Sequence, residues 1–260
     1  MLCIGIIFFT MLLMVVWHNY TWNPKNPGFY PNQRLMIIGH RGAPTLAREN
    51  TLLSFKKAIE LGVDGIELDV QYSRDKHLIV YHDWDIINSH GTREKIEDLS
   101  IKDLRVINQI PSLNEVLEII PDNNVLNIEI KSRFVKSTGI EKDVIDTVIN
   151  YNVQKNCIIS SFNPFIIRRI KKINPNILTG FLWSRDDPFF ILNSPYLAWF
   201  VRPDGFHPDI RHLTKKLAVW AKSRKMKILS FTVNTEDNLK KAKDLKIDGI
   251  FTDFPEIDKN

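Results

Sequence analysis

Three carboxylates and a lysine form two pairs with the spacing of side chains on one face of a strand. Glu67 and Asp69 are two positions apart inside one apolar run, and Glu129 and Lys131 are two positions apart at the end of another. Alternate residues of a strand point to the same side, so each pair faces one way. If Glu67, Asp69 and Glu129 converge at about 5 Å, they repel by roughly 3 kcal/mol per pair at an effective dielectric of 20.

Such a cluster needs compensation, which protonation, a basic neighbour such as Lys131 or a divalent cation can supply. Carboxylates are hard oxygen ligands, so the residue types suit Mg²⁺ or Ca²⁺. The alternative is a network of lysine and carboxylates that only holds the fold together. Either pair taken alone favours this alternative.

Two histidines, His40 and His82, directly follow apolar runs, and Arg41 follows His40. Hydrolysis of a phosphodiester needs a base to activate the attacking oxygen and an acid to protonate the leaving one. Two imidazoles that titrate near neutrality can divide these roles. Arg41, through its bidentate fork, and Lys131 would hold the phosphate oxygens. The alternatives are histidines that serve only as hydrogen-bonding groups, and cations that pair with the carboxylates.

Strands and helices must bring these residues together. In the sequence, short apolar runs typical of strands alternate with stretches that have the hydrophobic period of a helix. Strands are expected at 35–38, 65–70, 125–130, 157–160, 177–183, 204–206, 227–233 and 249–252, and helices at 51–61, 112–120, 140–150, 164–173, 213–224 and 235–245. Strict alternation implies parallel strands with crossover helices, and eight units suggest a closed (β/α)8 TIM barrel with its site at the carboxyl ends of the strands. A doubly wound open sheet is the alternative, weakened by the lack of G-x-G-x-x-G after the first strand.

Two stretches break the alternation. From His82 to Pro111 the chain is polar and too long for an ordinary connection, which predicts a small insertion over the barrel mouth after the second strand. The stretch 188–201 is apolar and aromatic, but too short and interrupted to span a bilayer. We expect it to pack on the barrel, and contact with a membrane interface is the alternative.

The N-terminal residues 2–17 are almost all apolar. A helix of that length spans about 24 Å, slightly less than a hydrocarbon core of about 30 Å. No Lys or Arg precedes the run and no small-x-small site follows, which disfavours a cleaved signal peptide. A buried core helix is the weaker alternative, because the run has no polar face. We expect a single-pass transmembrane anchor over 1–18, with its side of the membrane open, a linker over 19–34 and a barrel domain over 35–260.

Composition adds weaker constraints. The chain has 260 residues, 44% of them hydrophobic and 25% charged, which is ordinary for a globular protein with a sizeable core. A net charge of +5 weakly favours anionic partners, and no basic run interleaved with aromatics indicates nucleic acid. Cys3 and Cys157 lie in apolar runs without a C-x-x-C spacing, which excludes a disulfide framework. Cys157 is expected to be a small buried hydrophobe.

The ordered set of motifs resembles the glycerophosphodiester phosphodiesterase family. The motifs are His40-Arg41-Gly42, Glu49-Asn50-Thr51, Glu67-x-Asp69, His82-Asp83, Glu129-x-Lys131, Ser161-Phe162-Asn163, Thr232-Val233-Asn234 and Thr252-Asp253-x-Pro255. Each is weak alone, and the whole set, which covers about 36–255, is highly specific. Phe231 stands where the family usually has Trp, which alters a pocket wall and leaves the preferred alcohol open.

This resemblance implies a (β/α)8 barrel with an insertion after its second strand, and roles for eight residues. Glu67, Asp69 and Glu129 would bind a divalent metal, His40 and His82 would be the acid–base pair, Arg41 and Lys131 would contact phosphate, and Glu49 would support the His40–Arg41 region. Family members hydrolyse glycerophosphodiesters to sn-glycerol 3-phosphate and an alcohol. Whether water or the substrate's own glycerol hydroxyl attacks first stays open.

Three functions follow as hypotheses. The first is hydrolysis of soluble diesters such as glycerophosphocholine or glycerophosphoethanolamine. The second is a lysophospholipase D that acts on membrane lysolipids, which the expected anchor and the apolar stretch 188–201 favour. The third is a non-catalytic, membrane-tethered module that binds phosphate or lipid. The intact pair of His40 and His82 argues against the third, because binding alone needs no acid and base.

Overall fold

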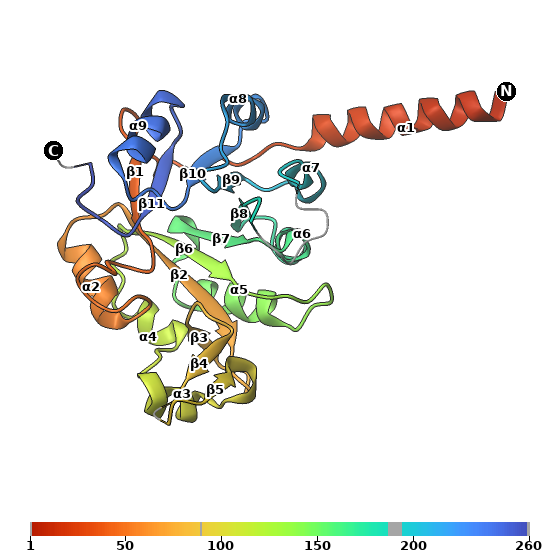
Figure 1. The fold of residues 1–260 in the computed structure, drawn as a ribbon. Helices are drawn as coiled ribbons and strands as arrows, with labels where there is room; N and C mark the ends of the chain where they lie inside the picture. Colours follow the sequence, from red (N-terminus) through yellow and green to blue (C-terminus); the bar gives the residue numbers. More distant parts are fainter. Residues whose placement is uncertain (1, 89, 187–193, 259–260) are drawn as a thin grey trace.

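A closed barrel of parallel strands forms the body of the protein (Figure 1). The computed structural model describes residues 2–88, 90–186 and 194–258. Within these residues eight parallel strands make the barrel: β1 Met36–Gly39, β2 Gly65–Tyr72, β6 Val125–Ile130, β7 Cys157–Ser161, β8 Leu178–Trp183, β9 Gly205–Pro208, β10 Lys227–Ser230 and β11 Gly249–Thr252. Their order is β1-β11-β10-β9-β8-β7-β6-β2, and pairing of β1 with β2 closes the ring. The prediction of a (β/α)8 barrel is confirmed, with one strand at each of the eight expected runs.

Helices between the strands cover the outside of the barrel (Figure 1). They are α2 Leu52–Glu60, α4 Leu113–Leu117, α5 Ile140–Asn150, α6 Pro164–Ile173, α7 Leu197–Val201, α8 Lys215–Ser223 and α9 Glu236–Asp244, and a short 3-10 helix, η2 Gln154–Asn156, precedes β7. Side chains of Thr51, Thr214 and Thr235 accept hydrogen bonds from backbone N–H groups in the first turns of α2, α8 and α9. These caps satisfy donors that have no partner within the helix, which explains where the helices begin.

The insertion after β2 is a small subdomain with its own apolar centre. It contains β3 Leu78–Val80, the antiparallel pair β4 Asp85–Ile87 and β5 Arg93–Lys95, the 3-10 helix η1 Ile96–Asp98 and α3 Ile101–Asn108. Ile79, Ile86, Ile96, Leu104 and Ile110 pack together in its core. The insertion lies where it was predicted, but its interior is regular rather than irregular. Its strands and helices are short, so the sequence of the insertion has no long stretch with the hydrophobic period of a strand or a helix.

Inside the barrel, an apolar layer lies below a polar one. Residues from six strands form the apolar layer, namely Met36, Ile38, Val125, Ile158, Leu178, Leu229 and Phe251. On β6 the side chain two positions beyond Val125 is Asn127 and the next on that face is Glu129. The polar side chains therefore gather at the carboxyl ends of the strands, where barrels build their sites.

The chain before the barrel begins with α1 Leu2–Thr21, which extends away from the other elements (Figure 1). Among the described residues, no helix is both long enough and apolar enough to cross a membrane. The predicted transmembrane helix is therefore not found. The end of α1 contacts the barrel domain: His18 Nε2 lies 2.7 Å from the carbonyl oxygen of Trp199, and Arg202 donates to the carbonyl of His18 at 2.6 Å. Trp22, in the expected linker, is buried against the barrel.

Two further expectations concern packing. Part of the apolar stretch 188–201 lies outside the described residues, and its described end forms α7. Ala198 and Val201 of α7 are buried in the core beside α6, so this part packs on the barrel as expected. Cys157 is fully buried, and burial raises the pKa of its thiol. It serves as a small core hydrophobe, as expected.

Candidate active site

The three predicted carboxylates converge at the carboxyl end of the barrel. Asp69 on β2 stands beside Glu129 on β6 in the parallel register, and Glu67 lies two residues before Asp69. One oxygen from each of the three lies within 4.8 Å of the others, and all three side chains are buried. Adjacent parallel strands in register produce this convergence, because residues that share a face of a strand line the same mouth.

Burial and mutual repulsion set the protonation of this cluster. Burial, together with the charges of Asp69 and Glu129, raises the pKa of Glu67 well above its ordinary value. Burial likewise raises the pKa of Glu129 to about 7, although Lys131 opposes it. Burial acts on Asp69 too, but the charges of Lys131 and Arg41 outweigh it and lower the pKa to about 2. The raised pKa values of Glu67 and Glu129 mean that their ionised forms are destabilised in this cluster. A further positive charge nearby would stabilise the ionised forms of both glutamates.

The two predicted phosphate-binding cations border the cluster, and both are ion-paired. Lys131 Nζ lies 3.4 Å from Glu129 and 3.8 Å from Asp69. Arg41 donates through Nη1 to both oxygens of Glu49, at 2.9 and 3.0 Å, and its Nε lies 3.3 Å from Asp69. Glu49 thus holds the guanidinium of Arg41 in place. The ion pairs of the alternative hypothesis also exist, and both cations still line cavities at this face.

Each predicted histidine forms a pair with an aspartate. His40 Nδ1 lies 2.7 Å from Asp253 Oδ1, and His82 Nδ1 lies 2.7 Å from Asp83 Oδ1. A carboxylate on Nδ1 fixes the ring and leaves Nε2 for proton transfer. Both histidines line one cavity. Burial lowers the pKa of His82, which keeps this imidazole neutral near pH 7.

Three supporting residues were not among the predicted site residues. Asn50 donates to Asp69 Oδ2 at 2.9 Å, and Asn234 donates to Asp253 Oδ2 at 2.5 Å while accepting from the Asp253 backbone N–H. Asp253 is the third, and its hydrogen bond with His40 lowers its pKa although burial opposes this. Their motifs, Glu49-Asn50-Thr51, Thr232-Val233-Asn234 and Thr252-Asp253-x-Pro255, were visible in the sequence. The contacts that give them roles join segments far apart in the chain.

The turn after β1 explains why a glycine follows His40-Arg41. Gly42 has φ +92°, in the left-handed region that favours glycine, and a Cβ there would lie 2.4 Å from Ser54 Oγ. Ser54 is buried and donates to the carbonyl of Arg41 at 3.0 Å. This close approach turns the chain so that the Arg41 N–H donates to Glu67 at 2.9 Å.

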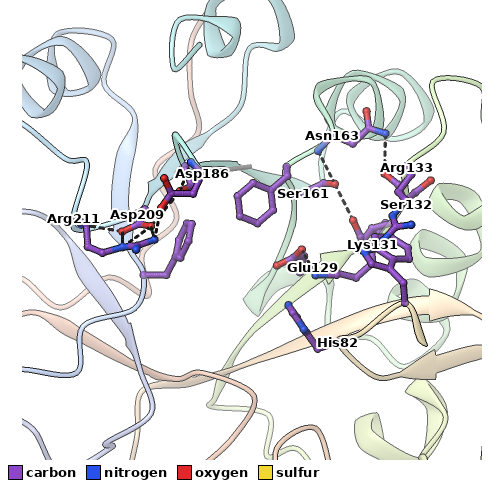
Figure 2. A pocket seen from close by; sticks show the side chains of 15 residues that line it. His82, Glu129, Lys131, Ser132, Arg133, Ser161, Asn163, Asp186, Asp209 and Arg211 are labelled. Carbon is purple, nitrogen blue, oxygen red and sulfur yellow. Dashed lines mark hydrogen bonds and ion pairs between the residues drawn. The ribbon is translucent and has the colours of Figure 1, made fainter. Parts of the chain in front are cut away.

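The site opens into two adjoining cavities. One has a volume of about 500 Å³ and the other about 290 Å³, and six residues line both, namely His82, Glu129, Phe162, Asp209, Arg211 and Phe231. Figure 2 shows the larger cavity, with His82, Glu129 and Lys131 on one side and Asp186, Asp209 and Arg211 on the other. Ser161 and Asn163 brace the rim, since Asn163 donates to the carbonyls of Ser132 and Phe134. The volumes suit a small organic phosphate.

The donor set fits a hard divalent cation. Besides the three carboxylates, Asn127 lines the smaller cavity, and its buried Oδ1 has no hydrogen-bond partner within the described chain. Its amide nitrogen is fixed by a hydrogen bond to Ser160 Oγ at 2.9 Å. An unpaired buried acceptor beside carboxylates suits a hydrated Mg²⁺ or Ca²⁺. In a second group with possible metal ligands, Asp186, Asp209 and His212, the two aspartates already pair with the guanidinium of Arg211.

Comparison with known proteins adds independent findings. The sequence profile of the glycerophosphoryl diester phosphodiesterase family matches residues 40–257. A glycerophosphodiester phosphodiesterase of Caldanaerobacter subterraneus is 33% identical, over 86% of this chain and 96% of that protein. The human lysophospholipase D GDPD1 is 25% identical, over 84% of this chain and 83% of that protein. An Oleispira antarctica phosphodiesterase, solved in complex with the product sn-glycerol-3-phosphate, is 25% identical, with a TM-score of 0.70 over 88% of this chain and 95% of that chain.

Fold and comparisons together define the class of this protein as a phosphoric diester hydrolase on a TIM barrel. The chain belongs to the glycerophosphoryl diester phosphodiesterase family. A hydrolase needs the acid and base that pure binding does not, so the non-catalytic alternative is set aside.

Proposed function

We propose that the protein hydrolyses soluble glycerophosphodiesters, such as glycerophosphocholine and glycerophosphoethanolamine, to sn-glycerol 3-phosphate and an alcohol, and that it requires a divalent cation. The observation that carries this proposal is that His40, His82, Glu67 and Glu129 line one cavity at the barrel mouth, with Asp69 beside the two glutamates. The product complex of the Oleispira antarctica relative supports the same substrate class.

The two histidine–aspartate pairs suit opposite roles in proton transfer. His82 is neutral near pH 7 because burial lowers its pKa, so it can accept a proton from the attacking hydroxyl or water. His40 is held at Nδ1 by Asp253, which leaves its Nε2 to pass a proton to the leaving oxygen. Lys131 and Arg41 would orient the phosphate oxygens while remaining paired with carboxylates.

Glu67, Asp69 and Glu129 would hold the cation, with Asn127 Oδ1 as an acceptor for its water. When bound, the cation would polarise the phosphate and stabilise developing charge on its oxygens. The residues of the chain fix the cluster, because Asn50 holds Asp69 and the Arg41 N–H holds Glu67.

Release of sn-glycerol 3-phosphate from the two diesters by the full chain tests the proposal. We expect release by the wild-type protein and a loss of about 100-fold or more in kcat after His40→Ala or His82→Ala. His77→Ala is a matched control, because His77 lies on the insertion with its side chain 55% exposed. Full activity of His40→Ala would reject the role given to His40. No release from either diester would reject the soluble substrates.

A second candidate is lysophospholipase D activity, which the likeness to the human lysophospholipase D GDPD1 favours. An apolar surface beside the cavities also favours it, since Phe134 and Val135 are 53% and 59% exposed in the loop after β6. Lysophosphatidylcholine, added at concentrations below its micelle threshold, would be cleaved faster than glycerophosphocholine if this candidate holds. Slower cleavage of the lysolipid would favour the soluble diester.

A further inference from the structure

The larger cavity has two walls of opposite charge. Lys131 and Arg133 line one side, and the guanidinium of Arg133 lies 4.1 Å from the centre of the Trp84 ring. Asp186 and Asp209 line the other side, across the cavity from Lys131 (Figure 2). A phosphodiester has its anionic phosphate at one position and its alcohol group several bonds away. The phosphate would bind on the side of Lys131, so the alcohol group would face the acidic wall.

Arg211 contacts both aspartates of the acidic wall, Asp186 and Asp209, and its single positive charge cancels only one of their two negative charges. Its Nε lies 3.1 Å from each oxygen of Asp209, and its Nη2 lies 2.6 Å from Asp209 and 2.9 Å from Asp186. Asp209 is buried and also accepts from Ser184 Oγ at 3.2 Å. A bidentate pair with a buried carboxylate fixes the position of the loop after β9.

The net charge of this wall is −1, from two carboxylates and one guanidinium. His212 lies nearby, with Nε2 3.7 Å from Asp186 and Nδ1 3.8 Å from Asp209. Its Nδ1 accepts a hydrogen bond from the backbone N–H of Arg185 at 3.2 Å. Arg211 contacts both oxygens of Asp209, so the excess negative charge of the wall lies on Asp186, whose side chain is 59% exposed.

Two phenylalanines also line the larger cavity. Phe162 and Phe231 line both cavities, and their rings meet edge to face, with centres 5.6 Å apart. The faces of aromatic rings attract ammonium groups, with quaternary ammonium as the best-known case.

We propose that Asp186, together with Phe162 and Phe231, forms a subsite for an alcohol group that carries a positive charge, such as choline or ethanolamine. The inference rests on the proposed function and adds a preference among its substrates. The enzyme then selects diesters of amino alcohols over a diester of a neutral alcohol such as glycerophosphoglycerol. Arg211 is a positioning residue that aligns the Asp186 carboxylate.

The test compares KM for glycerophosphocholine with KM for glycerophosphoglycerol in the wild-type protein and in Asp186→Asn. We expect the ratio of these KM values to rise about 5-fold in Asp186→Asn, because an exposed ion pair contributes about 1 kcal/mol or less. Asp186→Lys is expected to raise the ratio further. Asp122→Asn is the matched control, since Asp122 is exposed in the loop before β6, at the opposite end of the barrel.

An unchanged ratio in both Asp186 variants would overturn the subsite while leaving the diesterase activity intact. Absence of hydrolysis of both diesters by the wild-type protein would overturn the proposed function and the subsite with it. Phe231→Leu gives a second measure, because loss of the aromatic face is expected to raise the ratio without changing any charge.

Discussion

The Nδ1 atom of His40 lies 2.7 Å from the carboxylate of Asp253, although 213 residues separate them in the chain. The pairing of β1 with β11 brings them together, since Gly39 stands beside Thr252 in the register. Asn234 in turn fixes Asp253 with two hydrogen bonds. The proton donor of the proposed reaction is thus held by the last strand of the barrel.

Asp253→Asn is expected to lower kcat by about 100-fold, because the amide no longer enforces the tautomer and orientation of the His40 ring. Asp83→Asn is the matched comparison at His82. The Asp83 side chain is 67% exposed against 30% for Asp253, so we expect a loss of less than about 10-fold. Equal losses in the two variants would contradict this assignment.

Asn50 combines a left-handed backbone with a hydrogen bond to Asp69, and two substitutions separate these features. Its φ is +55°, and its amide donates to Asp69 Oδ2 at 2.9 Å. Both Asn50→Gly and Asn50→Ala remove the amide, so calorimetry is expected to show weaker Mg²⁺ binding in both, by about 10-fold. Only Ala is strained at positive φ, so Asn50→Ala is expected to unfold with about 1 kcal/mol less free energy than Asn50→Gly. Unchanged Mg²⁺ affinity in both variants would remove Asn50 from the metal site.

The sequence predicts the strands of the barrel more completely than it predicts the contacts within the site. The eight strands were predictable because strands buried on both faces are rich in apolar residues, such as Met36–Gly39. Helix α3 was missed because only Ile101 and Leu104 of its residues are buried, within a polar region. The convergence of Glu67, Asp69 and Glu129 was predictable from strand spacing. The partnership of His40 with Asp253 was not, since it depends on closure of the ring.

His207 is a buried residue whose environment no local pattern indicated. It lies inside the barrel, fully buried, with no hydrogen-bond partner for either ring nitrogen among the described residues. Gly180 makes room for the ring, since a Cβ there would lie 2.2 Å from His207 Cε1. Burial lowers the pKa of His207 to about 3.

This burial predicts a pH dependence of stability. The folded-state pKa of His207 lies below the unfolded value of about 6.5, so the unfolded chain binds the proton more readily between these values. The stabilisation from neutral His207 is therefore full above pH 6.5 and is lost as the pH falls towards 3, by up to about 5 kcal/mol. In urea titrations from pH 7 to pH 4, His207→Leu is expected to lose less free energy of unfolding than the wild-type protein. Parallel losses in the two proteins would show that His207 is protonated in the folded state.

The central claim, a metal-dependent diesterase at the Glu67–Asp69–Glu129 cluster, is tested most directly by removing and restoring the cation. The full chain would be treated with EDTA, dialysed, and assayed for sn-glycerol 3-phosphate released from glycerophosphoethanolamine, with Mg²⁺ or Ca²⁺ added back. We predict that release stops after EDTA, returns with at least one of the two ions, and does not return in Glu67→Ala. Undiminished release in EDTA, or recovery in Glu67→Ala equal to that of the wild-type protein, would contradict the account.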